Sequence, residues 1–227
     1  MPSWITHLAT SHQLLKELTV KDENSFIFGN IMPDILNNYI VKETSQHKDY
    51  EITHFTDEVI IHGIHYQFPN PQKFWREYQS QKENPVVLGF YVHLLTDYFW
   101  NYTTYEKHFK KINDQMVAIL ADGTEKPMEY QDAIHLKQRD FRIFTEVLKT
   151  RYPLSHLQDM PQLVENSNQI IENPLTREDI RKAIQKIEQM LESEEKSETE
   201  KYRLFTEEQL EQYFQESIQF ILQHQIR

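Results

Sequence analysis

The chain has 227 residues, and its 35 acidic residues outnumber its 24 basic residues, which gives a net charge of −11. A chain this acidic is a poor partner for double-stranded nucleic acid or an anionic membrane surface. It contains no cysteine, which excludes disulfides, thiolate metal ligands and cysteine nucleophiles. Only four glycines occur, so Gly-rich phosphate loops are excluded and helices are favoured over strands.

The predicted elements follow from apolar residues that recur every three or four positions, the period of a helix. Helices are expected over residues 11–18, 72–80, 85–105, 130–150 and 177–193, and a last helix from Thr206. Loops are expected over residues 19–25, 42–50, 69–72, 121–127 and 151–173, and the acidic, Ser-rich residues 192–201 are expected to form a solvated linker. These patterns predict an all-α protein.

The length favours a single domain, residues 1–227, because domains commonly reach 100–200 residues. Most histidines and aromatic residues lie in residues 1–150, and residues 151–227 are expected to form a C-terminal helical extension. The longest apolar segment, residues 85–102, is interrupted by His93 and Asp97, so no transmembrane segment is expected. The N-terminal residues lack the basic and apolar regions of a secretory signal, which predicts a cytoplasmic protein.

The most informative motif is Gly89-x3-His93-x3-Asp97, inside the most apolar predicted helix. Residues four apart share one helical face, and Gly89 removes a side chain where another segment must approach closely. A buried carboxylate is costly unless it is paired or bound to a metal. The pattern therefore leaves two interpretations open at this point: a structural His–Asp pair, or part of a metal site.

Three further residues have the chemistry to complete such a site. Asp34 follows Pro33, which presents the carboxylate from a rigid turn or helix start, His54 lies beside aromatic residues, and His7 lies near the N-terminus. Together with His93 and Asp97 they offer three imidazoles and two carboxylates. That set suits one or two zinc-like divalent ions, which would generate a hydroxide and bind a phosphate ester.

The order of these residues resembles the zinc-dependent phospholipase C family, which is similar in fold to the single-strand-specific zinc nucleases. The resemblance rests on Trp4 to His7, Gly29-x3-Pro33-Asp34, Thr53-His54-Phe55 and the Gly89 to Asp97 motif, and covers roughly residues 1 to 105. It implies an all-α multi-helix bundle. It also implies that Asp34, His54, His93 and Asp97 are metal ligands, that Asp97 bridges two zinc ions, and that His7 serves the second one.

The chain departs from that family at two places. The secreted phospholipases begin with a tryptophan whose free amino group binds zinc, whereas Trp4 is internal. The residues that hold a third zinc in the family also have no counterpart here, because Thr103 and Arg139 stand where ligands would be expected. One or two ions, zinc or another divalent metal, are therefore expected.

Other polar residues are candidates for substrate contacts. Asn101 lies one turn after Asp97, and His62 and His65 are three apart, so that they could share a helix face beside the substrate. A polar patch near a bend at Gly63 is the alternative for that pair. His135 is a candidate contact for a substrate phosphate, or an exposed helix residue.

The expected activity is hydrolysis of a phosphomonoester or phosphodiester, with a small phosphoester or a phospholipid head group as substrate. Asp34 and Asp97 are the expected catalytic carboxylates, and Asp34 or His65 could act as the general acid. The alternative is an inactive metal-binding scaffold or a partner-binding module. The chain has neither an adjacent His-Asp dipeptide nor an HExxH motif, which excludes two other classes of metallohydrolase.

Overall fold

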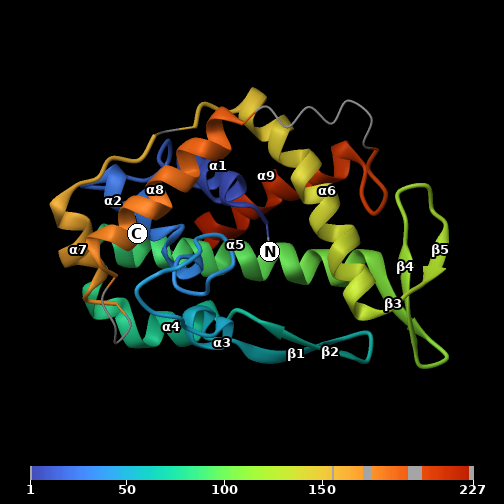
Figure 1. Ribbon diagram of the computed structural model, residues 1–227. Coiled ribbons are helices and arrows are strands. Elements are labelled where there is room, and N and C mark those ends of the chain that lie inside the picture. The colour runs from blue at the N-terminus through green and yellow to red at the C-terminus, as the bar shows by residue number, and fades with distance from the viewer. Residues whose placement is uncertain (1, 155, 171–174, 194–200, 225–227) are drawn as a thin grey trace.

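The computed structural model shows a helical body with two small antiparallel sheets at its edges (Figure 1). It describes residues 2–154, 156–170, 175–193 and 201–224. The helices are α1 (Trp4–Leu14), α2 (Glu23–Gly29), α3 (Tyr50–His54), α4 (Pro71–Tyr78), α5 (Pro85–His108), α6 (Tyr130–Arg151), α7 (Pro161–Ser167), α8 (Arg177–Glu192) and α9 (Glu207–Gln223), with 3-10 turns η1 (Met32–Asp34) and η2 (Gln79–Gln81). The strands are β1 (Asp57–Ile61), β2 (Ile64–Phe68), β3 (Phe109–Ile112), β4 (Gln115–Ile119) and β5 (Glu125–Pro127).

Helix α5 is the centre of the fold, as its apolar sequence predicts. The Asn84 side chain caps its first turn and Pro85 occupies the first helical position, where a missing N–H costs nothing. The helix packs against α1, α2, α4, α7 and α9, and Figure 1 shows it running through the middle of the molecule. His93 and Asp97 therefore lie in the protein interior.

The closest helix packing is between α2 and α5, and it depends on two glycines. A Cβ atom at Gly89 would lie 2.0 Å from the backbone oxygen of Phe26, and one at Gly29 would lie 2.3 Å from that of Val86. Only glycine leaves room for this backbone-to-backbone contact. The expectation that Gly89 permits a close approach is confirmed, and the approaching segment is the C-terminal end of α2.

The prediction of an all-α protein is wrong, because the chain contains five strands among its described residues. Strands β1 and β2 form one hairpin with His62 and Gly63 as its two-residue loop, and β3 pairs with β4 through Asn113 and Asp114. All four loop residues have positive φ, as tight hairpin loops require. The low glycine content was misleading because asparagine, aspartate and histidine supply three of these four positions.

The longer predicted helices are confirmed as α4, α5, α6, α8 and α9. The first helix begins earlier than predicted, at Trp4, because Ser3 caps it. The predicted loops over residues 19–25 and 151–173 contain the start of α2 and the whole of α7. Most of the predicted linker, residues 194–200, lies outside the described residues. Thr176 and Thr206 each form a capping box at the start of α8 and α9.

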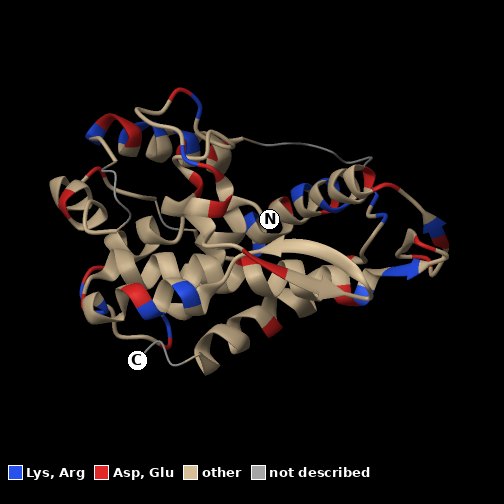
Figure 2. Cartoon of the chain, turned by 90° about the horizontal axis from the view of Figure 1, so that it is seen from below, with Lys and Arg blue, Asp and Glu red and all other residues tan. Residues whose placement is uncertain are grey.

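The C-terminal helices cover the N-terminal core. Helix α8 packs against α1, and α9 packs against both α1 and α5. Figure 2 shows that acidic and basic residues lie mainly on the outer helices and hairpins, whereas the inner helices carry few of either. In the described part of the chain, none of the helices combines the length and the apolar character that crossing a bilayer requires.

Candidate metal centre

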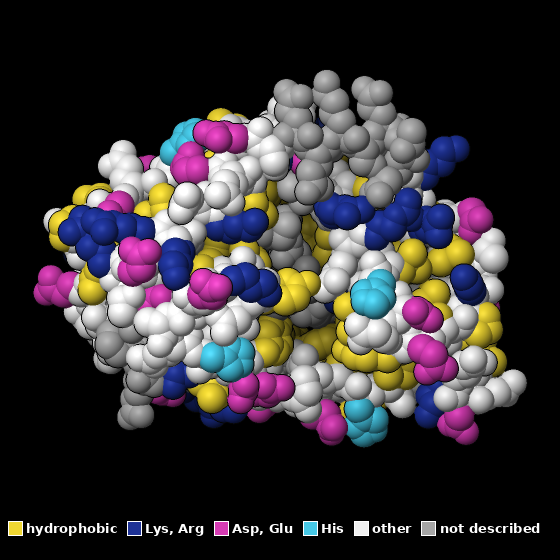
Figure 3. Space-filling model, viewed as in Figure 1, with side chains coloured by type: hydrophobic (Ala, Val, Ile, Leu, Met, Phe, Trp, Pro, Cys, Tyr) yellow, Lys and Arg dark blue, Asp and Glu magenta, His cyan; other side chains and the backbone are white. Residues whose placement is uncertain are grey.

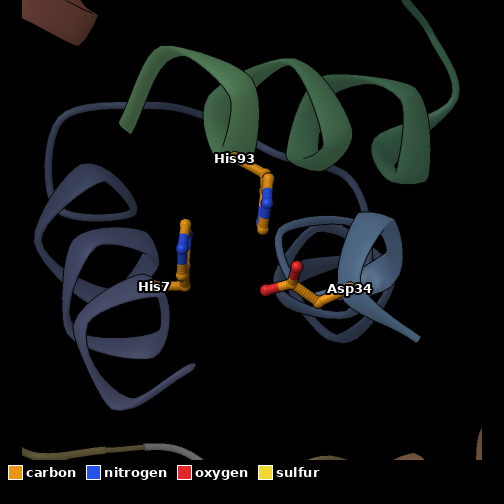
Figure 4. A group of neighbouring side chains, drawn as sticks. All are labelled: His7, Asp34 and His93. Atoms are coloured by element: carbon orange, nitrogen blue, oxygen red, sulfur yellow. The ribbon is translucent and has the colours of Figure 1, made fainter. Parts of the chain in front are cut away.

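Five residues singled out in the sequence meet in one buried cluster. His7 comes from α1, Asp34 from η1, His54 from the end of α3, and His93 and Asp97 from α5; all five are fully buried. Figure 4 shows three of them, His7, Asp34 and His93, pointing into a common space from three separate segments. We refer to these five residues as the His/Asp cluster.

The Asp97 carboxylate lies at the centre of the three imidazoles. Its Oδ1 atom is 3.3 Å from Nε2 of His7, and its Oδ2 atom is 3.4 Å from Nε2 of His54 and 3.6 Å from Nε2 of His93. The Oδ1 atom of Asp34 is 3.5 Å from Nε2 of His54. The same ring nitrogen of every histidine therefore faces the carboxylates.

The other ring nitrogen of His7 is held by Asn30. The Asn30 amide group donates to the backbone oxygen of His7 at 2.9 Å and to Ser11 Oγ at 2.7 Å, which fixes its orientation. Its Oδ1 atom then faces Nδ1 of His7 at 3.2 Å. An amide oxygen only accepts, so Nδ1 of His7 carries the proton and Nε2 of a neutral His7 presents a lone pair.

The same logic applies to the other two histidines. Nδ1 of His93 donates to the backbone oxygen of Asn30 at 2.8 Å, a bond that the close α2–α5 contact makes possible. The Thr53 hydroxyl donates to the backbone oxygen of Tyr50 and lies 2.8 Å from Nδ1 of His54, so it accepts from that nitrogen. Nε2 of His54 and Nε2 of His93 then face each other at 3.1 Å.

This arrangement leaves electron-rich atoms turned toward one another in the interior. Nε2 of His7 and both carboxylate oxygens of Asp97 have no hydrogen-bond partner. Uncompensated buried polar atoms are costly, and a cation among them would remove that cost. Metal-binding histidines characteristically donate their second N–H to a protein oxygen, as all three do here. The residues present therefore fit a divalent ion.

Electrostatics favour a neutral His7 and a neutral His54 around an ionised Asp97. Burial lowers the pKa of His7, with His93 adding to the effect, and burial also lowers the pKa of His54. Burial opposes ionisation of Asp97, but the three histidines hold its pKa well below the usual range. Burial likewise opposes charge on His93, yet the adjacent Asp97 raises the pKa of that imidazole.

Two groupings of ligand atoms within the cluster lie close enough to share an ion. Atoms of His7, Asp34 and His93 lie within 4.8 Å of one another, and so do atoms of His54, His93 and Asp97. Asp34 is itself held by two donors, the Trp4 indole at 3.2 Å and the Asn37 amide at 3.0 Å. Trp4 thus contacts the cluster through its side chain.

The remaining candidates lie elsewhere. His62 is in the β1–β2 loop and contacts the backbone oxygen of Glu106, and His65 is exposed on β2 beside Glu58. His135 is exposed on α6 and pairs with Gln131. The structure therefore does not bring these three histidines to the cluster. Asn101, in contrast, lines a cavity next to it.

Sequence reasoning missed the residues that orient the cluster. Asn30 and Thr53 stand inside the motifs that were recognised, but no role was assigned to either. Lys137 lines the same cavity as Asn101, and one feature of the sequence could have identified it as unusual. Lys137 falls in the apolar register of α6, four residues after the buried Ala133 and four before the buried Phe141, where a lysine is unexpected.

Comparisons with known proteins identify no relative: no family model matches the chain, and no curated protein or solved structure is similar to it. The case for a metal centre therefore depends on the residues themselves.

Proposed function

We propose that the His/Asp cluster binds one or two divalent ions of the zinc type and that the protein is a metal-dependent phosphoric ester hydrolase. The observation that carries the proposal is the orientation of the three imidazoles. Asn30 and Thr53 engage their Nδ1 atoms, so all three Nε2 atoms are directed at the Asp97 carboxylate. Nitrogen and carboxylate oxygen ligands in such a set are typical of zinc.

The number of ions depends on how His93 and Asp97 are shared. His93 belongs to both groupings, but one imidazole nitrogen has one lone pair and binds one ion. The two oxygens of Asp97 face different histidines, Oδ1 toward His7 and Oδ2 toward His54. A two-ion centre would therefore use Asp97 as the bridging carboxylate, as the resemblance to the phospholipase C family implies.

The hydrolase assignment rests on this resemblance and on a cavity that adjoins the cluster. When bound, a divalent ion supplies Lewis-acid chemistry, drawing charge from a phosphoryl oxygen and acidifying water. Asp34 and Asp97 would hold the ion. The Trp4 and Asn37 donors keep the Asp34 carboxylate in place, so the site is organised before the substrate enters.

A structural metal is the second candidate, and the complete burial of all five residues favours it. A structural ion would hold α1, η1, α3 and α5 together without any turnover. The cavity favours the enzyme, because a purely structural site needs no space for a second molecule beside it.

Metal analysis combined with turnover of bis(p-nitrophenyl) phosphate and p-nitrophenyl phosphate tests the proposal. The zinc-loaded protein is expected to hydrolyse at least one of them, and His54→Gln is expected to lose zinc and turnover together. His65→Gln is the matched control, because His65 is exposed on the β1–β2 hairpin. Bound zinc without turnover of either ester would favour the structural metal, and absence of zinc after reconstitution would refute both.

A further inference from the structure

We propose that the cavity beside the His/Asp cluster is the substrate site, that Lys137 binds an anionic oxygen of the phosphoester, and that the aromatic wall accommodates an aryl or similarly apolar leaving group. The inference rests on the proposed function and names the class of substrate that this function requires.

The cavity lies between α5, α6, β2 and the segment that follows η1, and its volume is about 360 Å³. That size falls in the range of small-molecule sites. One part of its wall is aromatic and is formed by Tyr39, Tyr50, Phe68, Tyr105 and Tyr130, and the rest is mostly polar. Figure 3 shows the face of the molecule hollowed near its centre, with hydrophobic side chains gathered around the hollow.

Three residues connect the cavity to the His/Asp cluster. The Tyr50 ring stacks on the His54 ring with centroids 3.9 Å apart, and the Asn37 amide donates to Asp34. Asn101 lies on α5 one helical turn after Asp97. All three line the cavity, so a molecule bound there would lie against the immediate neighbours of the cluster, although none of the five cluster residues itself lines the cavity.

Lys137 places a positive charge in this cavity; the Asp97 carboxylate acts on that charge from a distance, and Asp49, which also lines the cavity, pairs with His47. Lys137 is only 4% exposed. Its Nζ atom donates to Oδ1 of Asn101 at 3.0 Å and lies 4.7 Å from the centroid of the Tyr105 ring. Lys137 forms no ion pair with any described residue. An ammonium group has three N–H donors, so donors remain for a ligand.

Burying a lysine that forms no ion pair with a described residue is unfavourable, and an anionic ligand would reduce that cost. Burial lowers the pKa of Lys137 to about 8, which leaves the amine mostly protonated near neutral pH. A cationic leaving group would be repelled by this charge. An anionic oxygen at Lys137 with an apolar group against the tyrosines satisfies both features of the cavity.

Calorimetric titration of the zinc-loaded protein with inorganic phosphate and with phenylphosphonate, which is not hydrolysed, tests the assignment. Lys137→Met is expected to weaken phosphate binding by roughly 10- to 100-fold, the usual effect of losing a hydrogen bond to a charged group. Zinc content should not change. Lys186→Met removes the same charge from an exposed position of α8 and should leave the affinity unchanged.

The aromatic wall is tested separately by Tyr130→Ser. Tyr130 is 46% exposed at the cavity, so this variant should fold even if Lys137→Met does not. It is expected to reduce phenylphosphonate affinity several-fold, by roughly the energy of one aromatic contact, and to leave phosphate affinity unchanged. Lys137→Arg, which keeps the charge, should retain more phosphate affinity than Lys137→Met.

The outcomes separate the substrate site from the catalytic assignment. Unchanged phosphate affinity in Lys137→Met, or equal phenylphosphonate affinity in Tyr130→Ser, would overturn the assignment of the cavity even if ester hydrolysis occurs. Loss of both affinities in a protein that binds zinc but hydrolyses no ester would support the cavity as an anion site and refute the hydrolase alone.

Discussion

Asp97 and Asp140 are both fully buried, but their surroundings differ. The Asp140 carboxylate accepts hydrogen bonds from three consecutive backbone N–H groups, those of Arg203, Leu204 and Phe205, at 2.7 to 3.2 Å. The Asp97 carboxylate has no hydrogen-bond partner and faces three imidazole nitrogens. Asp140 is thus satisfied by backbone donors, whereas Asp97 has no such donors and faces groups that could hold a metal ion with it.

The difference distinguishes a carboxylate that backbone donors satisfy from one that the proposed ion would use as a ligand. Asp140 joins α6 to the segment before α9, and its surroundings are complete without a ligand. Asp97 is surrounded by imidazoles whose Nδ1 atoms already have partners, so its charge is balanced either by a proton on His93, whose pKa it raises, or by a cation at the centre. Burial by itself does not distinguish the two residues; the chemistry of their partners does.

The largest expected effect comes from Asp97→Asn, which removes the central charge while keeping the shape. Zinc should raise the unfolding temperature of the wild-type protein, because a ligand that binds only the folded state stabilises it. We expect that zinc-dependent shift to disappear in Asp97→Asn, with zinc affinity reduced by about 100-fold or more. Thermal unfolding of both proteins with and without zinc measures the shift in unfolding temperature. An undiminished shift would show that Asp97 is not a ligand.

Asp140→Ala should produce the opposite combination. Three backbone donors lose their acceptor, which is expected to cost about 2–4 kcal/mol of unfolding free energy. Zinc bound per folded chain should remain unchanged. Urea unfolding and metal analysis measure the two effects, with Glu165→Ala on the exposed face of α7 as the control. A loss of zinc from the folded variant would contradict the separation of the two carboxylates.

Gly89→Ala probes the helix contact that positions His93. The new Cβ atom would overlap the backbone of α2 and displace the oxygen that accepts from Nδ1 of His93. We expect a cost of about 1–3 kcal/mol and zinc affinity lowered by roughly 10-fold or more. Gly123→Ala is the control: its φ is +81° but its surroundings are open, so it should cost about 1 kcal/mol and leave zinc binding intact.

Thr53→Val tests the orientation of His54 with almost no change in shape. The valine cannot accept from Nδ1 of His54, and zinc affinity should fall by about 10-fold. Thr104→Val is the matched control, because the Thr104 hydroxyl is buried on α5 without a hydrogen-bond partner. Direct competition with a zinc indicator dye measures both. Equal losses in the two variants would mean that the hydroxyl of Thr53 does not orient the ring.

The smallest expected effect concerns His108, a buried histidine outside the cluster that contacts the Tyr213 hydroxyl at 2.9 Å. Burial lowers the pKa of His108 from 6.5 to about 4. The contribution of neutral His108 to the free energy of unfolding is therefore fully present above pH 6.5 and is lost as the pH falls toward 4. Between pH 7 and 5.5 the loss should be about 1 kcal/mol. His108→Phe should show a correspondingly weaker decrease in urea stability over that interval; an identical decrease would contradict it.

The sequence predicts the members of the His/Asp cluster better than it predicts the fold. His93 and Asp97 could be placed together because both lie on one strongly apolar helix, where spacing determines geometry. The meeting of His7, Asp34 and His54 depends on tertiary packing, and only the resemblance to a family suggested it. The close contact between Gly29 and Gly89 could be predicted only in part. Spacing placed Gly89 on the same face of α5 as His93 and Asp97, but it did not reveal that α2 packs against that face.

The hairpins show why local patterns were misread. His62 and His65 were considered as helix neighbours, yet Ile64, Tyr66 and Phe68 alternate with polar residues, which is the period of a strand. The two-residue loops use His62, Asn113 and Asp114 at positive φ, so glycine counting could not reveal them. Lys137 could not be assigned either, because its environment is formed by Asn101 and Tyr105 from a different helix.

An ion bound by the His/Asp cluster would also link segments that lie far apart in the sequence. The members of the cluster extend from His7 to Asp97, and the protein has no cysteine. An ion held by both ends would act as a covalent cross-link does, restricting the unfolded chain. For a loop of about 90 residues the chain-entropy relation for disulfides gives roughly 4–5 kcal/mol. A protein that cannot form a disulfide would thus obtain a comparable constraint from an ion, and a chelator would act on it as a reductant acts on a cystine.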